Sequence, residues 1–177
     1  MAELCLDTLE SEVGKILLVA NDGYLCALEF ADCEPRLMQS LQQRYGSISL
    51  KAVSNPLGFS HKLRAYLQGD CNSLASIPVN PGGTTFQQRV WAALREIPPG
   101  CTQSYRELAE KVDRPKAYRA VGMANSQNPI AIVIPCHRVI GANGRLTGYA
   151  GGLERKQWLL QHEQLHSKTS QQLSLLT

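Results

Sequence analysis

The sequence lacks the features that mark membrane and secreted proteins. Its 177 residues contain no apolar run close to the roughly 18–20 residues that a transmembrane helix needs. The first residues, Met1-Ala2-Glu3, do not have the charged-then-apolar pattern of a secretory leader. We therefore expect a soluble, cytoplasmic protein that has no membrane partner.

Paired cysteines and clustered metal ligands are also missing. Six cysteines are spaced widely and irregularly, without a Cys-x-x-Cys pair, which favours reduced thiols over a disulfide framework. The four histidines form no compact ligand set with these cysteines. We expect no metal site and no cofactor. The residues concerned are Cys5, Cys26, Cys33, Cys71, Cys101, Cys136, His61, His137, His162 and His166.

The net charge of +3 is small but unevenly distributed along the chain. Residues 1–84 contain 6 Lys/Arg and 9 Asp/Glu, a net charge of −3, whereas residues 85–165 contain 11 and 6, a net charge of +5. The basic half is the place to look for an anionic partner. A difference of this size is equally compatible with ordinary surface variation.

The first half has the pattern of a small α/β subdomain over residues 1–70. The runs 15–20 and 24–30 resemble strands, and Asn21-Asp22-Gly23 between them favours a tight hairpin turn. Apolar residues every fourth position behind Pro35 predict a helix. A second helix is predicted from about Ser60 to Gln68, ending at Gly69.

Residues 71–84 are rich in turn formers, so we place a linker and the domain boundary there. The domain that follows spans residues 85–166. The tail, residues 167–177, consists largely of Ser, Gln and Thr and is expected to be disordered. The predicted fold class is α+β, with a small N-terminal α/β subdomain before a mainly helical domain.

Two helix starts are marked by capping-box patterns in the second half. Thr85 with Gln88 opens one helix, and Ser104 with Glu107 opens the next. Asp113-Arg114-Pro115 then ends that helix and opens a third. Two helices joined by a short turn, the second with a basic outer face, are typical of a helix-turn-helix that approaches DNA, although such pairs are also common elsewhere.

The third helix has two distinct faces at helical spacing. One face gathers small and apolar residues, and the other is basic and exposed in our prediction. The apolar face holds Ala117, Ala120, Val121 and Ala124, and the outer face holds Lys116, Arg119 and Met123.

An apolar run, residues 130–134, leads into Pro135-Cys136-His137-Arg138. We expect the run to be a short buried strand that delivers Cys136 to a pocket. A cysteine beside apolar residues is more often a small core residue. A reactive cysteine needs a base for its proton and a group that orients this base. His137 and Glu163 are the candidates for a relay of this kind, which a cysteine hydrolase would share with other thiol chemistry.

Several motifs together resemble the O6-alkylguanine-DNA alkyltransferases. The resemblance covers about residues 86–163 and rests on five segments in this order. They are Ser104-Tyr105-Arg106-Glu107-Leu108, Arg119-Ala120-Val121-Gly122, Asn128-Pro129, Ile134-Pro135-Cys136-His137-Arg138-Val139 and Tyr149-Ala150-Gly151-Gly152. Because Pro-Cys-His-Arg is itself a strong marker of the family, this combination is very specific.

The resemblance implies that the partner is double-stranded DNA containing O6-alkylguanine. Cys136 would accept the alkyl group, chiefly methyl, irreversibly and once, with His137, a water and Glu163 as its proton relay. Asn128 would brace the turn between the recognition helix and the active-site segment. The protein is expected to be monomeric when free.

The resemblance also implies roles in binding. Arg119 would enter the base stack in place of the flipped guanine, with Lys116 and Ala120 beside it at the DNA. Tyr105 would crowd the phosphate of the target and help to protonate the departing guanine. A second set, Tyr149, Val139 and Ala150, would line the alkylguanine pocket.

One position departs from some relatives, because Ala150 stands where they carry a hydroxyl residue. Two other classes remain to be weighed. A sensor that binds alkylguanine without repairing it would lack the nucleophile, whereas this chain has Cys136. If the protein were a cysteine hydrolase, the basic recognition helix would have no function.

Overall fold

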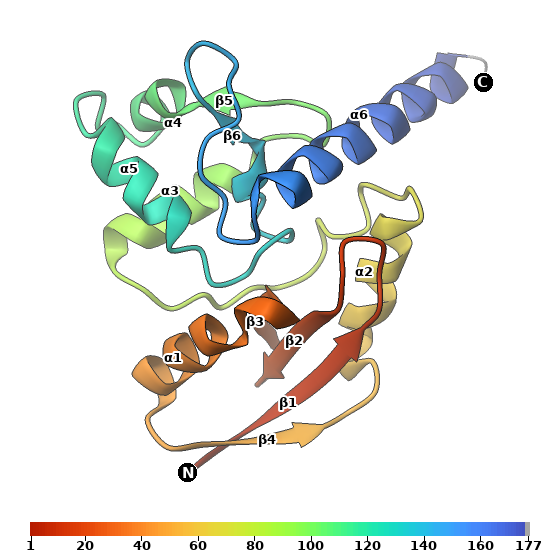
Figure 1. Cartoon of the computed structure of the whole chain (residues 1–177), viewed down its shortest axis with the longest axis vertical. Helices are drawn as coiled ribbons and strands as arrows, with labels where there is room; N and C mark the ends of the chain where they lie inside the picture. The colour runs from red at the N-terminus through yellow and green to blue at the C-terminus, as the bar shows by residue number, and fades with distance from the viewer. Residues whose placement is uncertain (176–177) are drawn as a thin grey trace.

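The computed structural model describes the backbone of residues 1–175 and the side chains of residues 1–167. A sheet with two flanking helices forms the lower part of Figure 1, and a mainly helical part lies above it. This arrangement confirms the α+β fold class. The long final helix starts between the two parts and projects away from them (Figure 1).

Four strands make the N-terminal sheet, in the order β3-β2-β1-β4. The predicted hairpin is confirmed as β2 (Ile16–Asn21) and β3 (Tyr24–Phe30), which pair antiparallel. We missed β1 (Ala2–Leu9) and β4 (Ile48–Ala52). These two strands pair in parallel although more than forty positions separate Leu4 from its partner Leu50, so no local turn signal announces them.

The period of two along β2 sends alternate side chains to different cores. Leu17 and Val19 pack with α1 (Glu34–Tyr45), in a small cluster of their own. Ile16 and Leu18 point the other way, into the main cluster. The sheet is therefore covered on both faces, by α1 on one side and by the rest of the molecule on the other.

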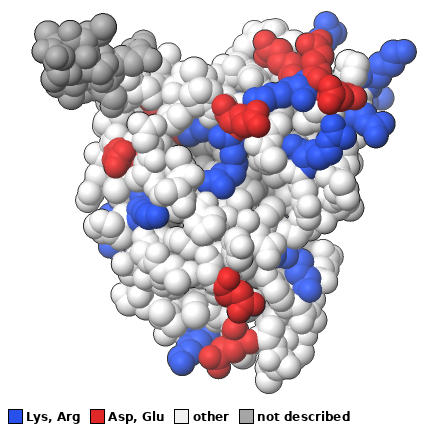
Figure 2. All heavy atoms as spheres, turned by 180° about the vertical axis from the view of Figure 1, so that it is seen from behind, with Lys and Arg blue, Asp and Glu red and all other residues white. Residues whose placement is uncertain are grey.

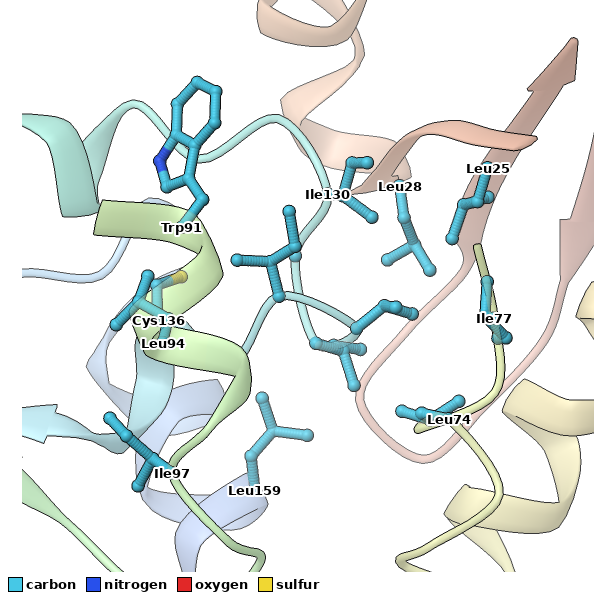
Figure 3. Close-up of a cluster of buried hydrophobic side chains, with 14 of the residues drawn as sticks. Leu25, Leu28, Leu74, Ile77, Trp91, Leu94, Ile97, Ile130, Cys136 and Leu159 are labelled. Carbon is cyan, nitrogen blue, oxygen red and sulfur yellow. The ribbon is translucent and has the colours of Figure 1, made fainter. Parts of the chain in front are cut away.

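The main hydrophobic cluster joins the two halves of the chain. In Figure 3, Leu25 and Leu28 of β3 face Ile130, while Leu94 and Cys136 lie on the opposite side of the same core. Backbone hydrogen bonds cross the boundary too, since Leu28 N donates to Pro129 O and Ala131 N donates to Leu28 O. The core beneath Cys136 is thus built by both halves.

The segment 71–84 is rich in turns, yet it is anchored. Its residues Cys71, Leu74 and Ile77 are buried in the main cluster. Val79 forms a parallel bridge with Leu25. The segment follows α2 (Phe59–Leu67), close to the predicted helix, and Gly69 after it has a φ of 117°.

The helices of the second half begin largely as predicted. α3 (Thr85–Arg95) has a capping box, but its N-cap is Thr84 with Gln87, so our assignment to Thr85 and Gln88 was one residue late. The Ser104–Glu107 capping box is confirmed at the start of α4 (Tyr105–Lys111). The remaining short elements are β5 (Gln103–Ser104), η1 (Ala31–Cys33), η2 (Pro56–Gly58), η3 (Cys136–Arg138) and β6 (Val139–Ile140).

Two expectations about α5 (Tyr118–Ser126) were wrong. The helix starts three residues after Pro115, so Lys116 and Ala117 precede it. Ala120 is exposed rather than packed, because the buried face is formed by Val121, Ala124 and Asn125.

The run 130–134 is buried as expected, but it is not a strand. Ile130 makes one bridge to Leu28, and then turns follow, with Ile134 N donating to Ile130 O. Ile132 has a φ of 70°, which is incompatible with a strand. Hydrophobicity predicted the burial, whereas the compact turn depends on backbone contacts that periodicity does not report.

The last helix, α6 (Leu153–Leu175), begins where we expected but extends further. It continues through residues 167–175, where we predicted a disordered tail, and residues 176–177 lie outside the described residues. Gln and Leu in this stretch are reasonable helix formers. No helix within the described residues is long and apolar enough to cross a membrane.

Candidate active site around Cys136

Cys136 lies at the start of η3, with 7% of its surface exposed. Its N–H donates to Ile134 O over 2.8 Å, which closes the turn after the apolar run. Burial raises the pKa of the thiol, while the Asn128 amide and the Lys156 ammonium oppose this. The site is thus built around a thiol that needs help to ionise.

Asn128 braces the turn that carries Cys136. Its side-chain NH₂ donates to Ile134 O at 2.7 Å, and its side-chain oxygen accepts from Ile130 N at 2.9 Å. Asn128 is itself only 2% exposed. Both ends of the 130–134 segment are therefore tied to one side chain.

His137 and Glu163 are brought together in the core. His137 Nε2 lies 2.7 Å from Glu163 Oε1, and both side chains are fully buried. An ionised carboxylate can only accept, so Nε2 carries the proton and donates it to Glu163. The other nitrogen, Nδ1, is buried and has no hydrogen-bond partner among the described residues.

Two residues that sequence reasoning did not assign to the site complete the surroundings of Glu163. Arg138 donates from Nη2 to Oε1 at 2.7 Å and from Nε to Oε2 at 2.9 Å, a bidentate ion pair. The Tyr66 hydroxyl, from α2, donates to Oε1 at 2.8 Å. Arg138 belongs to the motif that we quoted, but nothing in the sequence connects Tyr66 with Glu163.

The protonation states follow from these contacts. Burial alone would raise the pKa of the Glu163 carboxyl, but its contacts with His137 and Arg138 outweigh burial and hold this pKa well below its usual value. Burial lowers the pKa of His137, and Glu163 offsets this only in part. Arg138 therefore neutralises Glu163, and His137 stays uncharged near neutral pH with a lone pair on Nδ1.

A small recess opens beside Cys136. Its volume is about 20 Å³, enough for roughly one water molecule. Of the predicted site residues, Tyr149 and Ala150 line it, whereas Val139 and Tyr105 do not. Val139 is buried in β6, and Tyr105 is half-buried at the start of α4, where its hydroxyl accepts from Thr147 at 3.0 Å.

Residues 147–151 form the outer wall of this recess, and we call them the pocket loop. Two neighbouring side chains of α6 hold the two ends of the loop. Lys156 Nζ donates to Thr147 O at 2.7 Å, and Arg155 donates to Gly151 O at 3.1 Å. Arg155 also pairs with Asp32 at 2.8 Å and lies over the Phe30 ring.

The predicted DNA-contacting residues lie together but away from the thiol's immediate contacts. Arg119 and Ala120 are exposed on α5, and Lys116 is exposed in the turn before it. Figure 2 shows Lys and Arg side chains gathered with acidic ones at one corner of the molecule. On the face drawn in Figure 2, the basic side chains at this corner therefore do not form a patch free of acidic ones.

Arg36 of α1 is a further residue that we missed. It donates to Ser126 O at 2.6 Å and to Asn128 O at 3.1 Å, and lies 3.7 Å from the buried Glu29 carboxylate. A cation at the carbonyl end of α5 suits the helix dipole. Arg36 also lines the recess, so the N-terminal subdomain supplies part of the site. An Arg in an amphipathic helix gives no signal of this role.

The region described by the structure contains no group of three or more His, Cys, Asp or Glu that could hold a metal ion. All six cysteines are free thiols.

Two family models match nearly the whole chain. Residues 5–81 match the ribonuclease-like domain of 6-O-methylguanine DNA methyltransferase, and residues 85–165 match the DNA-binding domain of the same family.

Known proteins of the family are similar over their full length. A methylated-DNA–protein-cysteine methyltransferase of Shigella flexneri is 44% identical over 166 residues, which cover 92% of this chain and 97% of that protein. The Mycobacterium tuberculosis O6-methylguanine methyltransferase structure has a TM-score of 0.73 at 39% identity, with 94% of each chain covered. A structure of Mycobacterium tuberculosis OGT in complex with DNA has a TM-score of 0.73 at 38% identity, covering 93% of this chain and 94% of that one. The chain belongs to the 6-O-methylguanine DNA methyltransferase family.

Proposed function

We propose that this protein repairs DNA by transferring an alkyl group from O6 of guanine to the sulfur of Cys136. The observation that carries this proposal is that the buried Cys136 thiol is followed in the chain by a buried, uncharged histidine. His137 has its Nε2–H committed to Glu163 and its Nδ1 free of partners among the described residues. Such a histidine can accept the thiol proton, directly or through one water.

The reaction balances with groups that the chain provides. The thiol proton goes to His137 Nδ1, and the sulfur lone pair forms a bond to the alkyl carbon. The bond between that carbon and guanine O6 breaks, and its electron pair leaves with the guanine, which then takes up a proton. Tyr105 is our candidate to help with this protonation. The product is a thioether, which water does not reopen, so each molecule acts once.

Access to the recess requires movement. Guanine O6 lies inside the duplex, so the nucleotide must be extruded at a cost of a few kcal/mol. The recess of about 20 Å³ is too small for a guanine, so we infer that its lining, including the pocket loop, shifts outward when the base enters. We assign to Arg119, which is exposed on α5, the role of filling the gap that the base leaves in the stack. The six free thiols suit the reducing cytoplasm, where we place the protein.

Replacement of the nucleophile tests the transfer. Cys136→Ala should abolish uptake of a methyl group from an oligonucleotide with one O6-methylguanine, measured by intact-protein mass, while DNA binding persists. The matched control is Cys101→Ala, at an exposed thiol, which should transfer normally. Methyl uptake by the Cys136→Ala protein would refute the assignment.

A second test addresses base extrusion. Arg119→Ala should slow repair of duplex DNA far more than transfer from free O6-benzylguanine, if this base is accepted, because only the duplex must be opened. Lys116→Ala is the control, since it removes a neighbouring exposed charge but no inserting side chain. Equal losses on both substrates in Arg119→Ala would indicate a damaged site instead.

A further inference from the structure

Lys156 is an unusual residue in the core. It lies in the first turns of α6 and has 0% of its surface exposed. Its ammonium donates to two main-chain oxygens of the pocket loop, Thr147 O at 2.7 Å and Gly148 O at 3.5 Å. Within the described residues, no carboxylate lies in ion-pair distance of this cation. A buried charge is costly unless another charge compensates it.

The other buried charges near Cys136 are already matched. Glu163 is paired with Arg138 at 2.7 Å, and Glu29 lies 3.7 Å from Arg36. His137 is uncharged. Lys156 is therefore the one cation near the site, among the described residues, that lacks an anion. A group that can become an anion is the thiol of Cys136, which lines the recess together with Gly148, whose carbonyl accepts from Lys156.

We propose that Lys156 is the counterion of the Cys136 thiolate and that the same ammonium fastens the pocket loop over it. The proposal rests on the proposed function only for its consequence in methyl transfer. Lys156 acts through Cys136 and the loop rather than by touching the alkyl group, so it is a positioning residue. The two tasks are linked because Gly148, which Lys156 holds, lines the recess together with Cys136.

The titration behaviour of the two groups is consistent with this pairing. Burial lowers the pKa of Lys156 to about 8, and Cys136 opposes this shift. Burial raises the pKa of Cys136, against the influence of Asn128, Lys156 and Arg36, with Glu29 acting in the direction of burial. Tyr149 also faces the thiol, and its own pKa is raised well above the usual value by burial and by Cys136.

The charge balance of the reaction identifies the step at which Lys156 acts, which is the ionisation of the Cys136 thiol. When the thiol proton moves to His137, the site gains an imidazolium and a thiolate. The thiolate is then stabilised by the imidazolium and by Lys156 until its lone pair bonds to the alkyl carbon. Removing Lys156 should make this ionisation harder below about pH 8, where its ammonium is charged, with the greatest loss where little thiolate forms.

The decisive measurement is the midpoint of thiolate formation at Cys136. It is followed by the ultraviolet absorbance of the thiolate during a pH titration, after subtraction of the same protein carrying Cys136→Ser. Lys156→Met keeps the length of the side chain and removes its charge. We expect its midpoint to rise by about one unit or more, and methyl transfer at neutral pH to slow about tenfold or more. Lys156→Arg, which keeps a cation, should keep the wild-type midpoint.

The matched control is Arg155→Met. Arg155 is the adjacent cation and holds the other end of the pocket loop, but it is paired with Asp32. Its loss should leave the midpoint unchanged. An unchanged midpoint in Lys156→Met, or an equal shift in Arg155→Met, would overturn the counterion proposal. The titration needs no DNA, so its result does not depend on the proposed function. The proposed function fails only if the wild-type protein takes up no methyl group.

A reciprocal measurement covers the case in which Lys156→Met does not fold. The pKa of the Lys156 ammonium can be followed by NMR in the wild type and in Cys136→Ser. Coupling between two sites is mutual, so the pKa of Lys156 should be lower in Cys136→Ser, which cannot form the anion. Equal pKa values in the two proteins would contradict the proposal.

Discussion

The two sides of Cys136 are held in contrasting ways. On the inner side, Glu163 is fully buried and accepts hydrogen bonds from Tyr66, His137 and Arg138 at 2.7–2.9 Å. On the outer side, the pocket loop contains exposed residues such as Thr147 and Ala150. An ion pair to the exposed Asp32 secures the loop through Arg155.

This difference matches the two tasks of the site. Proton transfer needs fixed distances, and a fully satisfied buried set of ion pairs and hydrogen bonds provides them. Entry of a flipped base needs a wall that can move, and the exposed contacts of the pocket loop, unlike its contact with the buried Lys156, are cheap to break. The comparison predicts that removing the buried charge on the inner side costs the most stability, whereas breaking the exposed contacts of the outer side chiefly changes access.

The largest loss of stability is expected for Glu163→Gln. The amide keeps the size of the side chain but leaves the buried Arg138 guanidinium without a negative charge, which should cost about 3–5 kcal/mol of unfolding free energy. Urea denaturation measures this. The control, Glu110→Gln, changes an exposed carboxylate and should cost well under that amount. A loss below about 1 kcal/mol in Glu163→Gln would refute the rigid inner side.

The same pair of proteins has a defined pH dependence. The pKa of Glu163 is lowered in the folded state, so its stabilising contribution is complete above the unfolded value of 4.5 and declines as the pH falls through the lower folded pKa. The stability gap between wild type and Glu163→Gln should therefore be widest at neutral pH and shrink in acid. A stability gap that grows as the pH falls would contradict a lowered pKa of Glu163 in the folded state.

A smaller loss is expected for Tyr66→Phe. This change removes a single hydroxyl donor to a charged acceptor, worth about 1.5–3 kcal/mol, and leaves Arg138 and His137 in place. Thermal or urea unfolding should detect it. Tyr24→Phe, at a tyrosine with 46% of its surface exposed, is the control. Equal effects of the two changes would mean that the Tyr66 contact does not stabilise the site.

Two glycines of the pocket loop allow a matched comparison on the outer side. A Cβ added at Gly151 would fall 2.6 Å from the buried Phe30 ring, whereas one added at Gly148 would meet nothing within 4 Å. Gly151→Ala should therefore displace the loop and cost about 1–3 kcal/mol, while Gly148→Ala should cost less. If the two variants unfold alike, the loop is not seated on Phe30 in solution.

The smallest loss of stability is expected for Asp32→Asn. Asp32 retains 64% of its side-chain exposure, so its ion pair with Arg155 should contribute at most about 1 kcal/mol. The activation free energy of methyl transfer should change by more than the unfolding free energy, because the pocket loop loses a contact that holds it. A large loss of stability with an unchanged transfer rate would reverse our comparison of the two sides.

The sequence was sufficient for the local parts of the fold and for the motif residues. The hairpin, the Ser104 capping box and the start of α6 follow from neighbours in the chain. The parallel pair of β1 with β4 does not, because it depends on a crossover. Nor does the turn at 130–134, which a positive φ at Ile132 and the Asn128 contacts define.

The residues of the site also fall into two groups, those that the sequence identifies and those that only the tertiary structure reveals. Cys136, His137 and Asn128 lie within ten residues of one another, and a family motif marks them. Tyr66 and Arg36 reach the site from the other half of the chain, and only tertiary structure brings them there. Lys156 could have been suspected, since it is seven residues before Glu163 on the same face of a helix, but a lysine at such a position is usually taken for a surface residue.

The central claim, a single irreversible transfer to Cys136, is tested most directly by counting turnovers. A fixed amount of protein is mixed with a growing excess of DNA containing O6-methylguanine, and repaired guanine and protein mass are measured together. We predict that repair stops at one lesion per active molecule, with one methyl group on Cys136. Repair of many lesions per molecule, with free Cys136 recovered, would contradict the account.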